Sequence, residues 1–90
     1  MEKLNVLTAG QLRAARALLG IDQKQLADKA GVSVQTIRRM EASDGIVRGV
    51  IESLMKVVEA LERAGIEFIG ESAPSSGQGR GVRLKNPQGR

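Results

Sequence analysis

The sequence has no cysteine and no histidine, and Phe68 is its only aromatic residue. Without cysteine or histidine there can be no disulfide, no thiolate nucleophile and no zinc finger, and the commonest general base is missing. The lack of aromatic side chains argues against binding of single-stranded nucleic acid, whose bases stack on aromatic rings. These absences make an enzyme the weakest class of function, and they predict that the chain needs no metal and no cofactor.

Long apolar runs are also missing. No segment approaches the roughly 20 apolar residues of a membrane span. Residues 1–10 lack the apolar core of about 7 to 15 residues that marks a signal peptide. We therefore expect a cytoplasmic protein that does not enter a membrane, and the lack of cysteine suits that reducing compartment.

The chain does have a modest excess of positive charge. Its 14 basic and 10 acidic residues give a net charge of +4, and residues 72–90 alone contribute +4. A basic tail is compatible with a polyanionic partner such as nucleic acid, although it can equally serve solubility. Ninety residues form one small domain, which oligomerisation would help to stabilise.

Three short helices are predicted within residues 8–42. Each begins at a side chain that can cap a helix, and the first two end at a glycine; the caps are Thr8, Asp22 and Ser33, and the glycines are Gly20 and Gly31. Gln11 and Gln25 stand three residues after the first two caps, as a capping box requires. A longer helix is predicted over residues 50–64, where apolar residues recur every three or four positions.

After the helices the pattern alternates. "IEFI" at 66–69 and "VRL" at 82–84 predict two short strands joined by the turn-rich "ESAPSSGQGRG". An isolated hairpin is marginal in water, so these strands should pack on the helices or pair with a second copy of the chain. The residues expected at such a dimer interface are Ile66, Phe68, Ile69, Val82 and Leu84. The chain thus divides into a helical unit, residues 1–65, and a β extension with a flexible basic tail, residues 66–90.

Residues 23–42 fit the geometry of a helix-turn-helix. Close crossing of two helices needs a small residue on the first, a glycine able to turn left-handed between them, and a branched apolar residue on the second. Ala27, Gly31 and Ile37 occupy these places. The remaining apolar contacts would come from Leu26, Ala30, Val32 and Met40. An ordinary helical pair is the alternative, but seven agreements at fixed spacing favour the helix-turn-helix.

The outer side of the third predicted helix carries candidates for reading DNA. At about 100° per residue, Gln35, Arg38 and Arg39 share this side. Gln35 and Arg39 stand one turn apart and can reach adjacent base pairs in a major groove, where glutamine suits adenine and arginine suits guanine. Arg38 points toward the groove wall and is predicted to bind phosphate. Val34 lies on the flank, where it either meets a thymine methyl group or closes the core.

Further phosphate contacts are predicted beside this helix. Gln23 lies in the first turn of the second helix, where amide donors of side chain and backbone favour a phosphate. Simple exposure to solvent is the alternative for Gln23. Lys24 and Ser43 can add contacts on either side.

The acid that closes the third helix needs a different explanation. Glu41 shares the inner side with Ile37 and Met40, and a buried carboxylate without a partner is costly. Arg16 falls on the inward face of the first helix, so an Arg16–Glu41 ion pair would satisfy both groups. We therefore predict that Glu41 is structural.

The segment "LRAARALLGIDQKQLADKAGVSVQTIRRME", residues 12–41, resembles the lambda-repressor, or XRE, family of helix-turn-helix regulators, and the next helix extends the resemblance to about residue 64. In that family an arginine of helix one pairs with the glutamate closing helix three, the glutamine opening helix two binds phosphate, and the first, second and sixth residues of the recognition helix read bases. The matching residues here are Arg16, Glu41, Gln23, Val34, Gln35 and Arg39. The resemblance implies a mainly α, four-helix DNA-binding domain. "GIEFI" and "GRGVRL" resemble a C-terminal β element of short bacterial members, used in pairing.

Two functions remain after these observations. The first is a sequence-specific regulator, most simply a repressor, that binds an inverted repeat in double-stranded DNA as a homodimer. The second is a protein-interaction module on the same fold, an antitoxin or antiactivator that engages a toxin or another regulator. Residues 72–90 would serve the second function, because their basic, glycine-rich composition fits a segment that folds on a partner.

Overall fold

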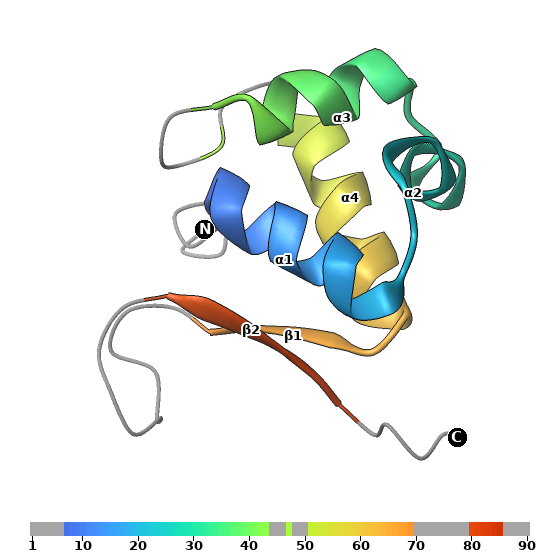
Figure 1. Ribbon diagram of the computed structural model, residues 1–90. Coiled ribbons are helices and arrows are strands. Elements are labelled where there is room, and N and C mark those ends of the chain that lie inside the picture. Colours follow the sequence, from blue (N-terminus) through green and yellow to red (C-terminus); the bar gives the residue numbers. More distant parts are fainter. Residues whose placement is uncertain (1–6, 44–46, 48–50, 70–79, 86–90) are drawn as a thin grey trace.

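A computed structural model of the protein describes residues 7–43, 47, 51–69 and 80–85. Over these residues the chain forms four helices followed by two strands. They are α1 (Ala9–Leu19), α2 (Gln23–Ala30), α3 (Val34–Glu41), α4 (Ile51–Arg63), β1 (Ile66–Ile69) and β2 (Gly81–Leu84) (Figure 1). The predicted mainly α fold with a C-terminal hairpin is therefore confirmed. Most of the turn-rich stretch between the strands and the end of the tail lie outside the described residues.

Reciprocal capping fixes where the first two helices begin. The hydroxyl of Thr8 accepts a hydrogen bond from the backbone N–H of Gln11 at 3.1 Å, and Oε1 of Gln11 accepts one from the N–H of Thr8 at 2.8 Å. Asp22 and Gln25 form the same box at the start of α2. Ser33 caps α3 through the N–H of Thr36. The polar residues before α1, α2 and α3 thus satisfy backbone donors that these helices leave without an internal acceptor.

Glycines end α1 and α2. Gly20 and Gly31 have φ angles of 69° and 74°, in the left-handed region that costs other residues free energy. The N–H groups of Gly31 and Val32 both donate to the carbonyl of Ala27, at 2.8 and 3.0 Å. This bonding closes α2 and turns the chain directly into α3.

One apolar core joins the four helices to β1. Its largest fully buried side chains are Leu7, Leu12, Leu26, Ile37, Met40, Val57, Leu61 and Ile66. Each helix contributes the apolar side chains of one face to this core, as their spacing of three to four residues predicts. The helix α3 therefore contacts the core through one face only.

The two strands pair with each other within the chain. They run antiparallel, with Ile66 opposite Leu84 and Phe68 opposite Val82. The sheet lies against α1 on the side away from α3 (Figure 1). Ile66 is 1% exposed, so its side chain serves the core of its own chain. The other residues expected at a dimer interface keep some exposed surface; they are Phe68, Ile69, Val82 and Leu84.

A buried glutamine fastens the sheet to α1. Gln11 is only 4% exposed, and its Nε2 donates to the carbonyls of Ile69 at 3.1 Å and Gly81 at 2.8 Å. Its sequence position predicts only the capping box with Thr8. The contacts with the sheet bridge 58 and 70 positions, which no local pattern can indicate.

Candidate nucleic-acid interface

The helix-turn-helix is formed by α2, a left-handed turn at Gly31, and α3. Ala27 on α2 is 2% exposed and Ile37 on α3 is 0% exposed, so the small residue and the branched residue of the motif both lie in the core. Figure 1 shows the two helices crossing at one end of the molecule, with α3 on its outer side. The geometry that the spacing of Ala27, Gly31 and Ile37 predicts is therefore present.

The outer side of α3 is polar and cationic. Ile37, Met40 and Glu41 are buried, whereas Gln35, Arg38 and Arg39 are exposed. Within the described part of the chain, neither arginine side chain is engaged by an acid. Three side chains that donate hydrogen bonds thus share a helix surface directed away from the core, which suits contact with an acceptor-rich groove.

Val34 lies between these two sides. It is half-buried and packs against the core. The structure therefore contains the packing that the sequence left as one of two alternatives. A contact with a thymine methyl group stays a prediction for the part of the side chain that remains exposed.

Two predicted phosphate ligands have contacts of their own. Nζ of Lys24 lies 3.5 Å from a carboxylate oxygen of Asp28, with both side chains more than two-thirds exposed. Such an exposed pair is worth only about 0.3–0.5 kcal/mol, so it leaves Lys24 able to exchange partners. The hydroxyl of Ser43 donates to the carbonyl of Arg39 at 3.3 Å, near the C-terminal end of α3. Lys24 lies in the first turn of α2 and Ser43 follows α3, and phosphate binding by either residue stays a prediction.

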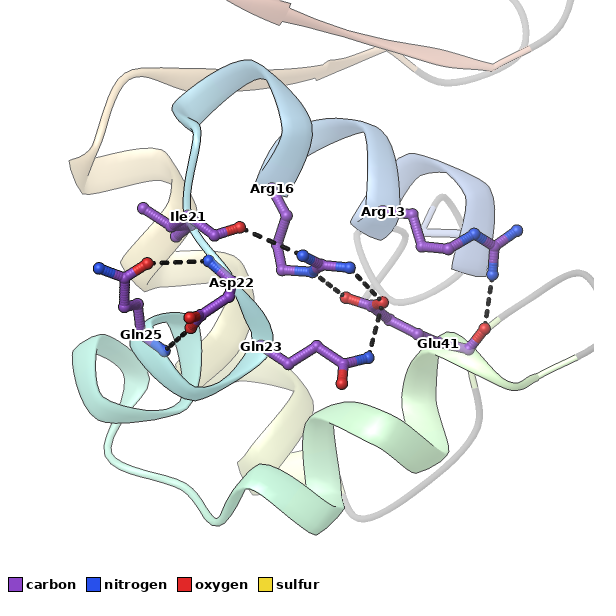
Figure 2. Close-up of polar contacts among 7 residues, drawn as sticks. All are labelled: Arg13, Arg16, Ile21, Asp22, Gln23, Gln25 and Glu41. Atoms are coloured by element: carbon purple, nitrogen blue, oxygen red, sulfur yellow. Dashed lines mark hydrogen bonds and ion pairs between the residues drawn. The ribbon is translucent and has the colours of Figure 1, made fainter.

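The structure joins Arg16 and Glu41 by a two-pronged ion pair between α1 and α3 (Figure 2). Nε of Arg16 donates to Oε2 of Glu41 at 2.6 Å, and Nη2 donates to Oε1 at 2.9 Å. The third nitrogen, Nη1, donates to the carbonyl of Ile21 at 3.1 Å. The Glu41 side chain is only 5% exposed and that of Arg16 is 22% exposed. The planar guanidinium therefore holds the inner side of α3 with fixed geometry.

Two further side chains converge on Glu41 and were not predicted to do so. Nε2 of Gln23 donates to Oε1 of Glu41 at 3.1 Å, and Nη1 of Arg13 donates to its backbone carbonyl at 2.5 Å (Figure 2). Arg13 precedes Arg16 by three residues, a spacing that places both on one side of α1 and offered a signal for its role. All three helices before α4 are thus tied together at Glu41.

Opposing influences act on the carboxyl group of Glu41. Burial raises its pKa, but hydrogen bonds from Arg16 and Gln23 and the charges of Arg16 and Arg13 together lower the pKa below its ordinary value of 4.5. The hydrogen bond to Glu41 raises the pKa of Arg16. Glu41 is therefore ionised in the folded protein at neutral pH. The positive charge of Arg16 compensates that of the carboxylate, which reduces its repulsion of DNA.

This lowered pKa predicts how stability depends on pH. Ionised Glu41 stabilises the fold above the unfolded pKa, near 4.5, and this contribution is lost as the pH falls through the lower folded pKa. Other acids titrate in the same range, so the informative quantity is the difference in unfolding free energy between the wild type and Glu41→Gln. We expect urea titrations to show this difference shrinking as the pH falls below about 4.5. A difference that stays constant from neutral to acidic pH would contradict the assignment.

Comparisons with known proteins agree with this geometry. The sequence model of a helix-turn-helix family, of the XRE type, matches residues 12–64, from within α1 to the end of α4. The chain belongs to that family and is a DNA-binding regulator of transcription, not an enzyme. It is similar to the cryptic phage CTXphi transcriptional repressor RstR of Vibrio cholerae serotype O1, with 31% identity over 78 residues, which cover 87% of this chain and 68% of the repressor.

No described helix is long and apolar enough to cross a membrane. Over the described ranges, no three acidic side chains converge in a way that could hold a metal ion.

Proposed function

We propose that this regulator represses transcription by binding an inverted repeat in duplex DNA as a homodimer, with α3 in the major groove. The observation that carries the proposal is the exposed surface of Gln35, Arg38 and Arg39 on a helix whose other side is fixed by Glu41. The similarity to a phage repressor supports the sign of regulation.

In this proposal, the residues that contact bases and those that bind phosphates lie at different places on the helix-turn-helix. Gln35 and Arg39 read adjacent base pairs, because their long polar side chains stand one turn apart on α3, and Val34 adds an apolar contact. Phosphates are bound by residues at the margins of the helix-turn-helix: Gln23, Lys24, Arg38 and Ser43. The side-chain amide of Gln23 donates one N–H to Glu41, and its second N–H would donate to a phosphate. Gln23 would thus connect the DNA backbone to Glu41, the residue that holds α3 in place.

Dimerisation follows from the proposed site on DNA. Two recognition helices must lie about 34 Å apart to enter successive major grooves on one face of the duplex. In the proposed division of labour, residues 1–65 bind DNA and residues 66–90 supply the dimerisation element. The site of action would be the cytoplasm, where bacterial or phage DNA is transcribed.

Selection of bound sequences from random duplex DNA tests this function. We expect an inverted repeat whose half-site centres lie about 10 base pairs, or a multiple of this, apart. The selection should be made at several stated salt concentrations, because phosphate contacts alone give affinity that falls steeply with salt. Recovery of one unrepeated half-site would contradict the dimeric mode, and recovery of no motif would contradict sequence-specific regulation.

A further inference from the structure

One side of α1 is exposed, small and apolar. Gly10, Ala14 and Ala17 are exposed there, and Leu18 is 46% exposed, one of two large hydrophobic side chains exposed among the described residues. At about 100° per residue these four positions fall within one continuous sector of the helix, between the sheet and α3. A leucine exposed beside three small residues forms an uncharged apolar surface, which the exposed Arg13 borders on the side of α3.

Strand β2 continues this surface. Nε2 of Gln11 lies 2.8 Å from the carbonyl of Gly81, which aligns the start of α1 with the start of β2. Both then run in the same direction (Figure 1). Seven residues of helix and three residues of strand each advance about 10 Å, so Leu18 comes level with Leu84. We name this surface the α1–β2 face; it consists of Gly10, Ala14, Ala17, Leu18, Val82 and Leu84.

The outer edge of β2 offers backbone groups for pairing. The N–H of Lys85 donates to the carbonyl of Gly65 at 2.7 Å, and bonded pairs alternate along an antiparallel ladder. Gly81 and Arg83 therefore direct their backbone groups toward β1, whereas Val82 and Leu84 direct theirs toward the opposite edge. Within the described residues the sheet has two strands, and no other described strand covers this edge. Such an edge is a template for another strand.

We propose that the α1–β2 face is the homodimer interface, with β2 pairing antiparallel to β2 of a second copy about a two-fold axis at Val82. This inference rests on the homodimer of the proposed function and specifies its surface. An axis at Val82 places Arg83 opposite Gly81 of the second copy, and Leu84 opposite Arg80. An axis at Arg83 would instead place two arginines opposite each other, which is unfavourable.

Charge along the seam also suits self-association. Nε of Arg83 lies 3.0 Å from Oε1 of Glu67 on the outer face of the sheet, so the cation nearest the axis is already neutralised within its own chain. The α1 members of the face carry no charge. The exposed Arg13 borders these residues on the side of α3, where its Nη1 donates to the backbone carbonyl of Glu41. Two identical surfaces can therefore meet through their uncharged members, with this cation directed toward α3.

The same axis brings the two α1 helices together in antiparallel orientation. Ala14 lies near the axis, and Leu18 falls opposite Gly10 of the second copy. A Cβ added at Gly10 would meet only the hydroxyl of Thr8, at 3.8 Å, so the space above this glycine is open to a side chain. Small residues permit interaxial distances near the 8–10 Å of packed helices. The isologous contact is thus self-complementary, as a two-fold interface must be.

The position of α3 favours this surface over others. The sheet and α3 lie on opposite sides of α1 (Figure 1). A two-fold axis running along the α1–β2 face, from the sheet toward α3, leaves the outer sides of both α3 helices pointing the same way. The other exposed large hydrophobic side chain in the described residues, Ile51, stands at the start of α4, away from the sheet.

Leu18→Arg and Val82→Pro test the interface, with Ile51→Arg as the matched control. Leu18→Arg places two positive charges in the interface, because each copy contributes one. Val82→Pro deletes an N–H directed to the outer edge while leaving the bonded positions of the β1–β2 ladder intact. In sedimentation equilibrium we expect both variants to weaken dimerisation roughly 100-fold or more. Ile51→Arg should dimerise as the wild type does, and circular dichroism should show the same helix content in all four proteins.

A second measurement covers the case of a variant that fails to fold. Because the chain has no cysteine, Ala14→Cys introduces a single thiol near the axis, and a short bis-maleimide should cross-link it to a dimer. Glu59→Cys, exposed on α4, should not cross-link. A wild-type dimer whose Leu18→Arg and Val82→Pro variants remain dimeric, or whose Ala14→Cys variant does not cross-link, would overturn this surface. A monomeric wild type at tens of micromolar would overturn the homodimer of the proposed function itself.

Discussion

Replacing Glu41 by alanine is expected to lower the melting temperature by roughly 12–24 °C. Loss of one partner from a buried ion pair costs about 3–5 kcal/mol, and we expect the lower end because the Arg16 side chain keeps 22% of its surface exposed. About 3 kcal/mol corresponds to this shift at 4–8 °C per kcal/mol in a domain of this size. Thermal unfolding followed by circular dichroism measures it.

The physical reason lies in what the substitution leaves behind. Arg16 would keep its charge but retain only the carbonyl of Ile21 as a hydrogen-bond acceptor among the described residues, and Gln23 would lose its acceptor on α3. The backbone bond from Arg13 to residue 41 does not need the carboxylate, so α3 should stay attached at its end. The expected result is therefore a less stable protein with the same helices, not an unfolded one.

Two controls separate the ion pair from a general loss of charge. Glu52→Ala removes an exposed carboxylate that lies 3.8 Å from Lys56 one turn along α4, and it should cost under about 0.5 kcal/mol. Changing both Arg16 and Glu41 to methionine removes both charges, so the double variant should be more stable than Glu41→Ala alone. Equal melting temperatures for Glu41→Ala and Glu52→Ala would exclude a stabilising role for the pair.

The sequence predicts the helices and the inner side of α3 because the signals for both are local. Caps and glycines mark the helix ends, and helical periodicity places Glu41 and Arg16 on inward faces where each needs a partner. Periodicity does not reveal how the Arg16 side chain extends or which further side chains bond to Glu41. Gln23 and Arg13 join Glu41 only because α2 and α1 cross α3 at particular angles, which the fold determines.

The pairing of the two strands, in contrast, could not be predicted from local signals. The alternation of residues 66–69 predicts a strand but does not distinguish pairing within the chain from pairing between copies. Gln11 contributes to the answer, because its amide bonds to both strand ends and draws the hairpin under α1. Ile66 then enters the core, and Glu67 and Arg83 meet on the outer face. Long-range closure of this kind depends on tertiary packing and not on any spacing in the sequence.

For DNA recognition, Arg39→Ala and Arg38→Ala are expected to weaken binding in different ways. Arg39 stands one turn after Gln35 on the exposed side of α3, where a guanidinium can form two hydrogen bonds with the O6 and N7 atoms of guanine. Its loss should cost about 1–3 kcal/mol on the selected site and abolish preference at one base position in each half-site. Random DNA should be affected far less.

Arg38→Ala is the matched control, because the two variants remove the same charge from neighbouring positions of one exposed helix face. A phosphate contact carries no sequence information, so Arg38→Ala should weaken binding to all sequences alike and reduce the salt slope by about 1 per half-site. Fluorescence anisotropy with the selected site and with random DNA, at several salt concentrations, distinguishes the two results. If Arg39→Ala lost the same affinity on both DNAs, it would have to be reassigned to a phosphate, and Gln35 would become the main candidate for direct base recognition on α3.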